Sequence, residues 1–392
     1  MSADPRDGAS PGPLRGLRVL EFAALGPVPF ACMVLADMGA EVVTIDRPDA
    51  EAADPRTSTR RGRTVVALDL KRDADREAAR DMAARADILV EGFRPGVMER
   101  LGLGPETLQE RNPGLIFARM TGWGQDGPLA QAAGHDINYI ALSGALDAIG
   151  PADGPPTVPL NLVGDYGAGA MFLVSGVLAA LYERSRSGLG QVLDVAISDC
   201  ALLLMAPFFS WAERGQLSPQ RGSNLLDGGA PHYRTYRTSD GKYVAIGALE
   251  PKFFRTLCEQ LGLPAHLHEA ASDRRRWPEL RAALEALLAT RTRDEWQALT
   301  EGSDACLVPV LALGEAESHA HHRARGAFVE IGLGLQPAPA PRFSRTPCAV
   351  PTLLSSASPR GVLERWPHSE SSDGSQMRAP GAGRKDGLNE SP

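Results

Sequence analysis

Residues 17–45, LRVLEFAALGPVPFACMVLADMGAEVVTI, contain the pattern that decides the fold. The apolar run at 17–22 has the length and composition of a buried β-strand. After a Gly-Pro turn, apolar residues recur at helical spacing over 28–38, and a glycine of the kind that ends helices follows. A second strand-like run covers 41–45. A strand, a helix and a strand in this order predict a βαβ unit with parallel strands.

The same alternation continues through the first third of the chain. Strand-like runs occur at 64–68, 88–90 and 115–120, and a charged helix is predicted over 73–84 between the first two of them. We therefore predict an α/β fold, with a large Rossmann-like domain around a mostly parallel sheet and a smaller α+β domain. Ligands of such sheets bind beyond the carboxyl ends of the strands.

The second half of the chain has a different pattern. Small and apolar residues predict a long helix over 167–185, followed by a strand over 191–197 and a buried helix over 198–211. Strands at 243–247 and 308–313 then flank a mainly helical stretch. The predicted division of the chain is a large domain over 1–196 to which 335–367 returns, linker helices over 197–227, a small domain over 228–320 and a disordered tail over 368–392.

Charge and composition exclude several classes of function. The 392 residues include 41 Lys and Arg against 48 Asp and Glu, a net charge of −7, so we expect no nucleic-acid partner. The five cysteines form no CxxC pair, which disfavours a disulfide framework and fits a cytoplasmic location. The longest apolar stretches, 171–182 and 201–209, are shorter than the roughly 20 residues that cross a bilayer, and residues 1–15 do not resemble a signal peptide. We therefore expect no membrane partner.

Several common catalytic motifs are absent from the sequence. Neither GxGxxG after the first strand nor GxxxxGK[ST] occurs, which disfavours dinucleotide-dependent and P-loop enzymes. GxSxG and HExxH are also absent, which disfavours α/β-hydrolases and zincins. His319, His321 and His322 cluster in an Ala- and Arg-rich stretch, and we interpret them as a solvated helix face rather than a metal site.

Three short segments carry side chains suited to proton transfer. His135 lies in a polar segment and matches general acid–base chemistry near neutral pH, the alternative being a surface-loop histidine. Asp165, in GDYGAGA, opens a predicted helix, where a carboxylate either caps the helix or acts as a base or nucleophile. Glu250 precedes Pro251 at a strand-to-helix junction and is either a poor cap or a residue that supports the chemistry.

Arginines recur at the ends of the predicted strands, namely Arg47, Arg60, Arg61, Arg63, Arg94 and Arg100. Because the carboxyl ends of parallel strands share one edge, these arginines are candidates to bind phosphate groups through charge-assisted forks. The alternative is ordinary solvated surface charge.

In combination and in order, the motifs of the chain resemble the family III CoA-transferases, and within them the α-methylacyl-CoA racemase branch. The segments that carry the resemblance are PLRGLRVLEFAALGP (13–27), IDRP (45–48), LDLK (68–71), EGFRPGVMERLGLGP (91–105), MTGWGQDGP (120–128), AGHDINYIALSG (133–144), PLNLVGDYGAG (159–169), GKYVAIGALEP (241–251), SDACLVPVL (303–311) and APRFSRT (340–346). AGHDINY and NLVGDYGAG are the segments typical of the racemase branch.

The resemblance implies an activity, namely the interconversion of (R)- and (S)-2-methylacyl-CoA thioesters by 1,1-proton transfer through an enolate. It places His135 and Asp165 on opposite sides of the α-carbon, with Glu250 bonded to the imidazole and backbone N–H groups near Asp136 at the enolate oxygen. It implies no metal and no cofactor other than the CoA of the substrate. The implied assembly is an interlocked homodimer whose site lies between the large domain of one chain and the small domain of its partner.

The resemblance also implies which residues contact coenzyme A, and it suggests Leu225-Leu226 as an apolar platform for the acyl chain. The residues implied for coenzyme A are Arg47, Leu68, Asp69, Leu70, Lys71, Gly92, Phe93, Arg94, Pro95, Gly96, Arg100, Gly134, Ile137, Asn138 and Tyr139.

The main alternative activity is that of a sister group. Family III transferases use the aspartate equivalent to Asp165 as a nucleophile to move CoA between acids. They usually lack a histidine at the position of His135 and carry a glycine-rich loop where this chain has residues 248–251. Both differences favour racemisation, and the presence of His135, Asp165 and Glu250 together disfavours a binding scaffold without turnover.

Overall fold

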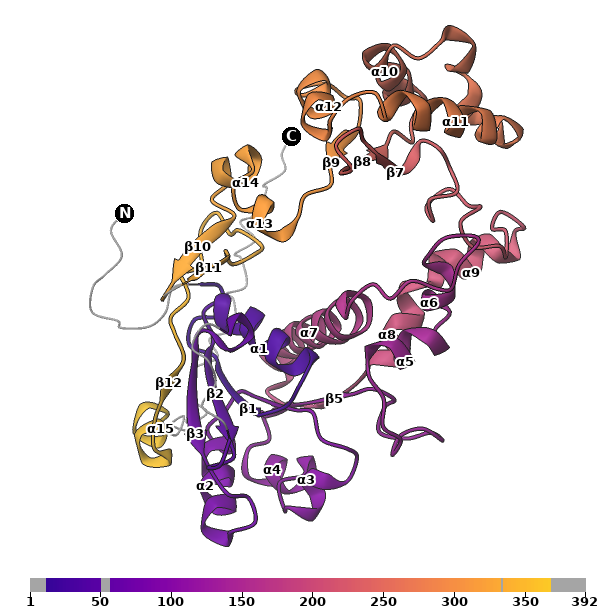
Figure 1. Ribbon diagram of the computed structural model, residues 1–392. Helices are drawn as coiled ribbons and strands as arrows, with labels where there is room; N and C mark the ends of the chain where they lie inside the picture. Colours follow the sequence, from indigo (N-terminus) through magenta and orange to yellow (C-terminus); the bar gives the residue numbers. More distant parts are fainter. Residues whose placement is uncertain (1–11, 51–56, 333, 368–392) are drawn as a thin grey trace, which may run out of the picture.

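A seven-stranded parallel sheet is the centre of the larger part of the molecule (Figure 1). The computed structural model describes residues 12–50, 57–332 and 334–367, so the tail predicted at 368–392 lies outside the described residues. The strand order is β12-β3-β2-β1-β4-β5-β6. The strands of this sheet are β1 (Arg18–Phe22), β2 (Glu41–Asp46), β3 (Arg63–Ala67), β4 (Ile88–Glu91), β5 (Ile116–Thr121), β6 (Val192–Ala196) and β12 (Ser355–Ser356).

Helices cover both faces of this sheet, which is why its central strands are nearly continuous apolar runs. One face packs against α1 (Pro27–Asp37) and α7 (Met171–Ser187), and the other packs against α2 (Asp73–Ala83) and α15 (Pro359–Arg365). Strand order reverses between β1 and β4, the topological switch point at which doubly wound sheets bind ligands. The predicted α/β fold with a mostly parallel sheet is therefore confirmed.

Shorter elements lie in the loops of the large unit. They are η1 (Ser58–Arg60), α3 (Val97–Arg100), α4 (Pro105–Arg111), α5 (Asp136–Leu142) and α6 (Ala145–Ala148). A π-helical segment, η2 (Leu162–Ala170), runs directly into α7. The resulting helix of 26 residues, Leu162–Ser187, is long and apolar enough to span a bilayer by length and hydropathy alone, so the apolar lengths read from the sequence were underestimated. One face of α7 packs against α1, β5 and β6, as a core helix does.

The second unit is an antiparallel sheet covered by helices, with a hydrophobic core of its own. Its strands, in the order β7-β8-β9, are β7 (Tyr233–Arg237), β8 (Tyr243–Gly247) and β9 (Leu307–Pro309). Its helices are α10 (Pro251–Leu261), η3 (Ala265–Leu267), η4 (Ala270–Ser272), η5 (Arg274–Arg276), α11 (Trp277–Leu288) and α12 (Arg293–Thr300). The chain returns through α13 (Leu313–Ala316), α14 (Ala320–Ala324) and the hairpin of β10 (Phe328–Ile331) with β11 (Gly334–Pro337).

Two predictions for the connecting region are wrong. The stretch 198–211 was expected to be one buried helix, but the structure has α8 (Ile197–Leu204) and α9 (Ala206–Glu213) with a break at Met205. Pro207 lacks a backbone N–H, so it cannot continue the hydrogen bonding of α8. It is tolerated in the first turn of a helix, and it lies in the first turn of α9. No described residue of α9 is buried, because its apolar side chains face an open cavity and the surroundings. The strand expected over 308–313 is also shorter than predicted, since β9 ends at Pro309, and α13 begins at Leu313.

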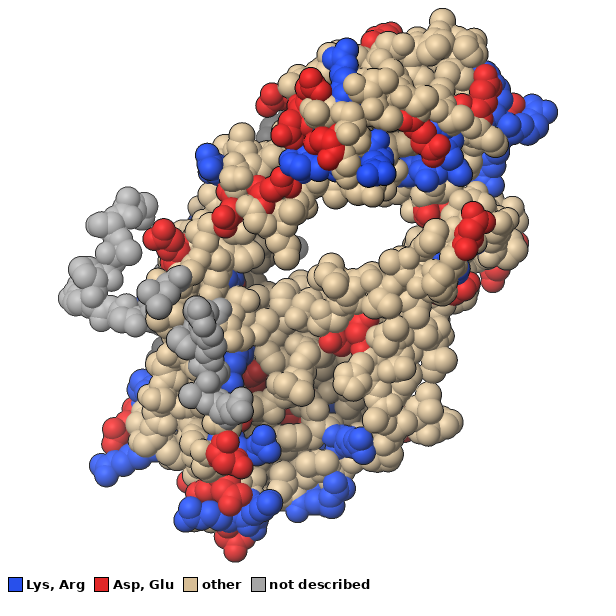
Figure 2. Space-filling view, viewed as in Figure 1, with Lys and Arg blue, Asp and Glu red and all other residues tan. Residues whose placement is uncertain are grey.

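An opening passes through the molecule between the two units (Figure 2). Its lower border, over α7 and neighbouring segments, is largely uncharged, whereas Lys and Arg side chains gather along the upper border below the small sheet. Large apolar side chains are exposed on α7, α8 and α9, including Tyr182 at 69%, Leu203 at 60% and Phe209 at 51%.

Candidate active site

A cleft of about 830 Å³ lies at the carboxyl ends of the parallel strands, next to the switch point. Its walls are the ends of β1 and β2, the loops that follow β3 and β4, the η1 segment, and two side chains near the start of η2, Asn161 and Tyr166. A single cleft therefore connects the strand ends, where phosphate-bearing ligands bind in such sheets, with the helix that carries Asp165.

The cleft brings together six of the residues that resemblance implies for coenzyme A. These are Arg47, Leu68, Asp69, Leu70, Lys71 and Phe93. Arg94 and Arg100 are exposed on the neighbouring loop and on α3, outside the walls of this cleft. The remaining implied residues, which lie outside its walls, are Gly92, Pro95, Gly96, Gly134, Ile137, Asn138 and Tyr139. Their contact with coenzyme A stays a prediction.

The arginines of the strand ends separate into two groups. Arg47 and Arg60 line the cleft, and Arg60 is held in place by an ion pair of 2.8 Å with Asp46. Arg63 reaches the wall, but its Nε lies 3.3 Å from the buried carboxylate of Glu21. Arg61 is buried in an ion pair of 2.5 Å with Asp37. The hypothesis that all of these arginines are available for phosphate is therefore wrong for Arg61, which serves the fold.

Two of the three proton-transfer candidates, His135 and Asp165, lie on segments that pack together, α5 and η2. His135 is the N-cap residue of α5, its side chain is exposed, and its backbone N–H donates to Oδ1 of Asn138 over 3.0 Å. Asp136, the next residue, is buried, and its Oδ2 accepts a hydrogen bond of 2.7 Å from the backbone N–H of Asp165. Gly164 allows this approach, because a Cβ there would lie only 2.5 Å from Oδ2 of Asp136. The two segments are thus tied together despite their separation in sequence.

The carboxylate of Asp165 lies in an unusual setting for a charged group. Its Oδ2 accepts a hydrogen bond of 3.2 Å from Nδ2 of Asn161, and a Cβ built on Gly26 would lie 3.0 Å from the same oxygen. Burial raises the pKa of Asp165, the nearby carboxylate of Asp136 raises it further, and the Asn161 hydrogen bond and His135 oppose this rise. A carboxyl group with a raised pKa is suited both to donate and to accept a proton near neutral pH.

Asp165 does not cap its helix. It lies inside the π-helical segment η2, whose N-cap residue is Asn161, so the capping alternative is wrong. Isolated π-helical turns occur often at functional sites, because the wider turn moves a side chain out of the regular helical register.

Glu250 lies away from this cluster. It is exposed at the N-cap position of α10 in the second unit, and its side chain forms no capping hydrogen bond, as expected of a poor cap. Within one chain, α10 and α5 lie on different sides of the opening (Figure 1). The contact with His135 that the resemblance implies is not made among the described residues of a single chain.

Two functional candidates were missed at the level of sequence. Asn161 precedes Asp165 by four residues, a spacing that places two side chains on the same face of a helix and that could have indicated the pair. Tyr166 stacks on Phe30 of α1 with ring centroids 4.4 Å apart, and it lines the cleft. Nothing in the local pattern predicts this contact, because it depends on how η2 crosses α1. No group of three or more potential metal ligands occurs in the part of the chain that the structure describes.

A doubly wound fold with a cleft at its switch point is typical of one class, the α/β proteins that bind a small ligand at the carboxyl ends of their strands. Comparison with known families matches residues 14–361 to CoA-transferase family III, and the chain belongs to this family. It is 46% identical over 340 residues to the alpha-methylacyl-CoA racemase of Mus musculus, covering 86% of this chain and 88% of that protein.

Two further similarities agree with this assignment. The alpha-methylacyl-CoA racemase of Homo sapiens is 42% identical over 340 residues, with the same coverage of 86% and 88%. The crystal structure of Rv3272 from Mycobacterium tuberculosis superposes with a TM-score of 0.74 at 30% identity, covering 90% of this chain and 98% of that one. The recognition of the family from sequence motifs is therefore confirmed.

Proposed function

We propose that the protein is an α-methylacyl-CoA racemase that interconverts (R)- and (S)-2-methylacyl-CoA thioesters. One observation carries the proposal: Asp165 is bonded to Asp136, the residue after His135, and it lies between Asn161 and Tyr166, which line the strand-end cleft. Burial raises the pKa of its carboxyl group, and His135 is near enough to oppose this rise. The names of the relatives from mouse and human support the same reaction.

The proposed chemistry uses the two side chains as alternating acid and base. One group removes the α-proton, the electron pair of the C–H bond moves into the thioester carbonyl to give an enolate, and the other group returns a proton to the opposite face. For the reverse direction the roles exchange. Asp165 must therefore be protonated in one direction and ionised in the other, and a pKa raised by burial brings these two forms closer in population at neutral pH.

The enolate oxygen needs hydrogen-bond donors that are already in place. Asp136 is the first residue of α5, so its backbone N–H has no acceptor within that helix. We assign this N–H to the enolate oxygen. The Asp136 carboxylate has a separate task, because its bond to the backbone of Asp165 fixes the distance between the two catalytic segments.

Two cavities of the chain take the two ends of the substrate. Arg47, Arg60 and Lys71 supply positive charge for the phosphates of coenzyme A in the strand-end cleft. An apolar cavity of about 810 Å³, lined by Val163, Leu225 and Leu226 among others, begins two residues from Asp165 and takes the acyl chain. The reaction needs no cofactor beyond the CoA that the substrate carries.

A homodimer completes the proposed site. The opening through the molecule and the exposed apolar side chains beside it fit a second chain that passes through and covers them. In such a pair, Glu250 of one chain can approach His135 of the other and orient its imidazole, which a single chain does not allow. We place the dimer in the cytoplasm, without a membrane or nucleic-acid partner.

The test is proton exchange with solvent. One enantiomer of a 2-methylacyl-CoA, incubated with the protein in heavy water, should yield both epimers with deuterium at carbon 2. Transfer of CoA to a free acid without deuterium incorporation would instead show the transferase reaction, with Asp165 as nucleophile.

A further inference from the structure

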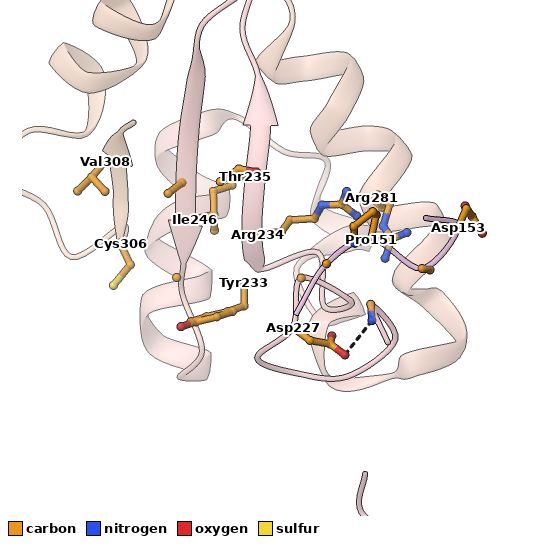
Figure 3. Close-up of a pocket in the computed structure, with 16 residues that line it drawn as sticks. Pro151, Asp153, Asp227, Tyr233, Arg234, Thr235, Ile246, Arg281, Cys306 and Val308 are labelled. Carbon is orange, nitrogen blue, oxygen red and sulfur yellow. Dashed lines mark hydrogen bonds between the residues drawn. The ribbon is translucent and has the colours of Figure 1, made fainter. Parts of the chain in front are cut away.

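A second cavity of about 820 Å³ adjoins the one assigned to the acyl chain (Figure 3). It lies between segment 150–153 of the large unit and the strands of the small sheet. Gly150 and Asp227 belong to the walls of both cavities, so the two chambers meet at these residues. An acyl chain that extends beyond the first chamber can therefore enter the second.

The second chamber has two arginines in its wall, Arg234 and Arg281. The first chamber also has two, Arg221 and Arg274, but Arg221 is held by an ion pair of 3.2 Å with Asp147. Arg234 comes from β7 and Arg281 from α11, and their guanidinium groups lie on the same side of the cavity in Figure 3. Arg234 is half-buried, and it contacts the ring of Tyr236 at 5.5 Å from the centroid. Among the described residues it has no hydrogen bond or ion pair through its side chain.

Arg281 also retains unused hydrogen-bonding capacity. Its Nη2 donates to the carbonyl oxygen of Gly229 over 2.5 Å, but its Nε is buried with no acceptor in the described part of the chain. A buried donor without a partner costs free energy. An anion placed between the two guanidinium groups would supply acceptors to both arginines.

Two acidic side chains, Asp153 and Asp227, belong to the wall of the chamber. The carboxylate of Asp227 accepts hydrogen bonds from the backbone N–H groups of Gly222, Asn224 and Gly229 at 2.8 to 3.0 Å, so it is turned into its own loop. Asp153 is exposed and lies at the outer end of segment 150–153 (Figure 3). Neither acid forms an ion pair with Arg234 or Arg281 among the described residues.

We propose that this chamber binds a carboxylate at the far end of the acyl chain, so that the preferred substrates are 2-methylacyl-CoA thioesters with a second, distal carboxyl group. The inference rests on the proposed function and adds to it the class of acyl group. The apolar chamber takes the methylene chain, and Arg234 with Arg281 takes the charge at its end. A small free carboxylate offers the same hydrogen-bond acceptors to the two arginines. The experiment therefore distinguishes a carboxylate attached to the acyl chain from a free one.

The experiment compares two thioesters of equal length, one ending in a carboxylate and the other in its methyl ester. The full-length protein should show a kcat/KM for racemisation roughly 10- to 100-fold higher with the carboxylate, as expected for charge-assisted hydrogen bonds. Arg234→Gln and Arg281→Gln should each bring this ratio towards one, and Arg234→Lys should keep much of it. Because the ratio is measured within each variant, a general loss of activity cancels.

Arg237→Gln is the matched control, since Arg237 is an exposed arginine of the same strand outside this chamber. It should leave the ratio unchanged. Equal kcat/KM for the two thioesters in the unaltered protein would overturn the proposal, even if free glutarate inhibits turnover of the methyl ester. A ratio that survives in both glutamine variants would overturn it as well. With either of these two results, racemisation of the methyl ester would still support the proposed racemase function, and only the proposal for the distal carboxylate would be lost.

Discussion

Gly26→Ala is a small change that should selectively impair the catalytic carboxylate. Gly26 precedes α1 with a φ of 70°, and a Cβ there would lie 3.0 Å from Oδ2 of Asp165. This contact is shorter than ordinary van der Waals separation, so the carboxylate must move by several tenths of an ångström. A misplacement of about 1 Å can cost on the order of 100-fold in rate, and we therefore expect kcat to fall roughly 10- to 100-fold.

The same substitution also strains the backbone, and this effect needs a separate control. Gly26 has a φ of 70° and a ψ of −117°, and an alanine held in such a sparsely populated conformation costs about 1–3 kcal/mol of stability. Gly16→Ala also places an alanine at a positive φ, 87°, but no atom lies within 4 Å of the added Cβ. Both variants should therefore lose stability in thermal unfolding, while only Gly26→Ala loses kcat in an epimerisation assay. Equal kcat in the two variants would refute the reasoning.

Three further predictions concern the site, a buried acid and the small unit. Asn161→Ala removes a hydrogen bond that favours the ionised form of Asp165, so the pKa of Asp165 should rise. For the enantiomer that Asp165 deprotonates, the acid limb of the profile of kcat/KM against pH should therefore move to higher pH. An unchanged profile would contradict this role of Asn161. Burial raises the pKa of Glu91 from 4.5 to about 7, so the folded state binds more protons than the unfolded state and stability is lost as pH rises through this window. Chemical denaturation should show this loss, on the order of 3 kcal/mol, in the unaltered protein and not in Glu91→Gln. Trp296→Ala should cost about 3–5 kcal/mol in the same measurement, because the indole is 1% exposed and bonds the carbonyl of Leu288, and a loss below about 1 kcal/mol would contradict its place in the core.

The parts of the fold that could be predicted are those with a strong local pattern. The strands β1, β2 and β4 are buried on both faces, and their apolar runs are visible without knowledge of their neighbours. The two-residue strand β12 has no such pattern, and it exists only because Ser355 pairs with Thr64 from the other end of the chain. Strand β7, YRTYR, also escaped prediction, since its register against β8 decides which of its polar side chains are buried.

The site shows the same division between local and long-range information. The chemistry of His135 and Asp165 is readable from residue type, but their proximity depends on the packing of α5 against η2. The hydrogen bond from the backbone N–H of Asp165 to Asp136 is part of this packing, and it joins residues too far apart in the sequence for spacing to predict it. The position of Glu250 on the other side of the opening likewise depends on the fold of the whole chain, and the role proposed for it requires a second copy.

Exchange of the α-proton in heavy water, followed separately for each enantiomer, tests the two-sided arrangement most directly. His135→Ala and Asp165→Asn should each abolish inversion, and each should still exchange the α-proton of one enantiomer with retention of configuration. The account predicts that the two variants act on opposite enantiomers. Exchange of the same enantiomer by both variants, or continued inversion in either, would contradict it.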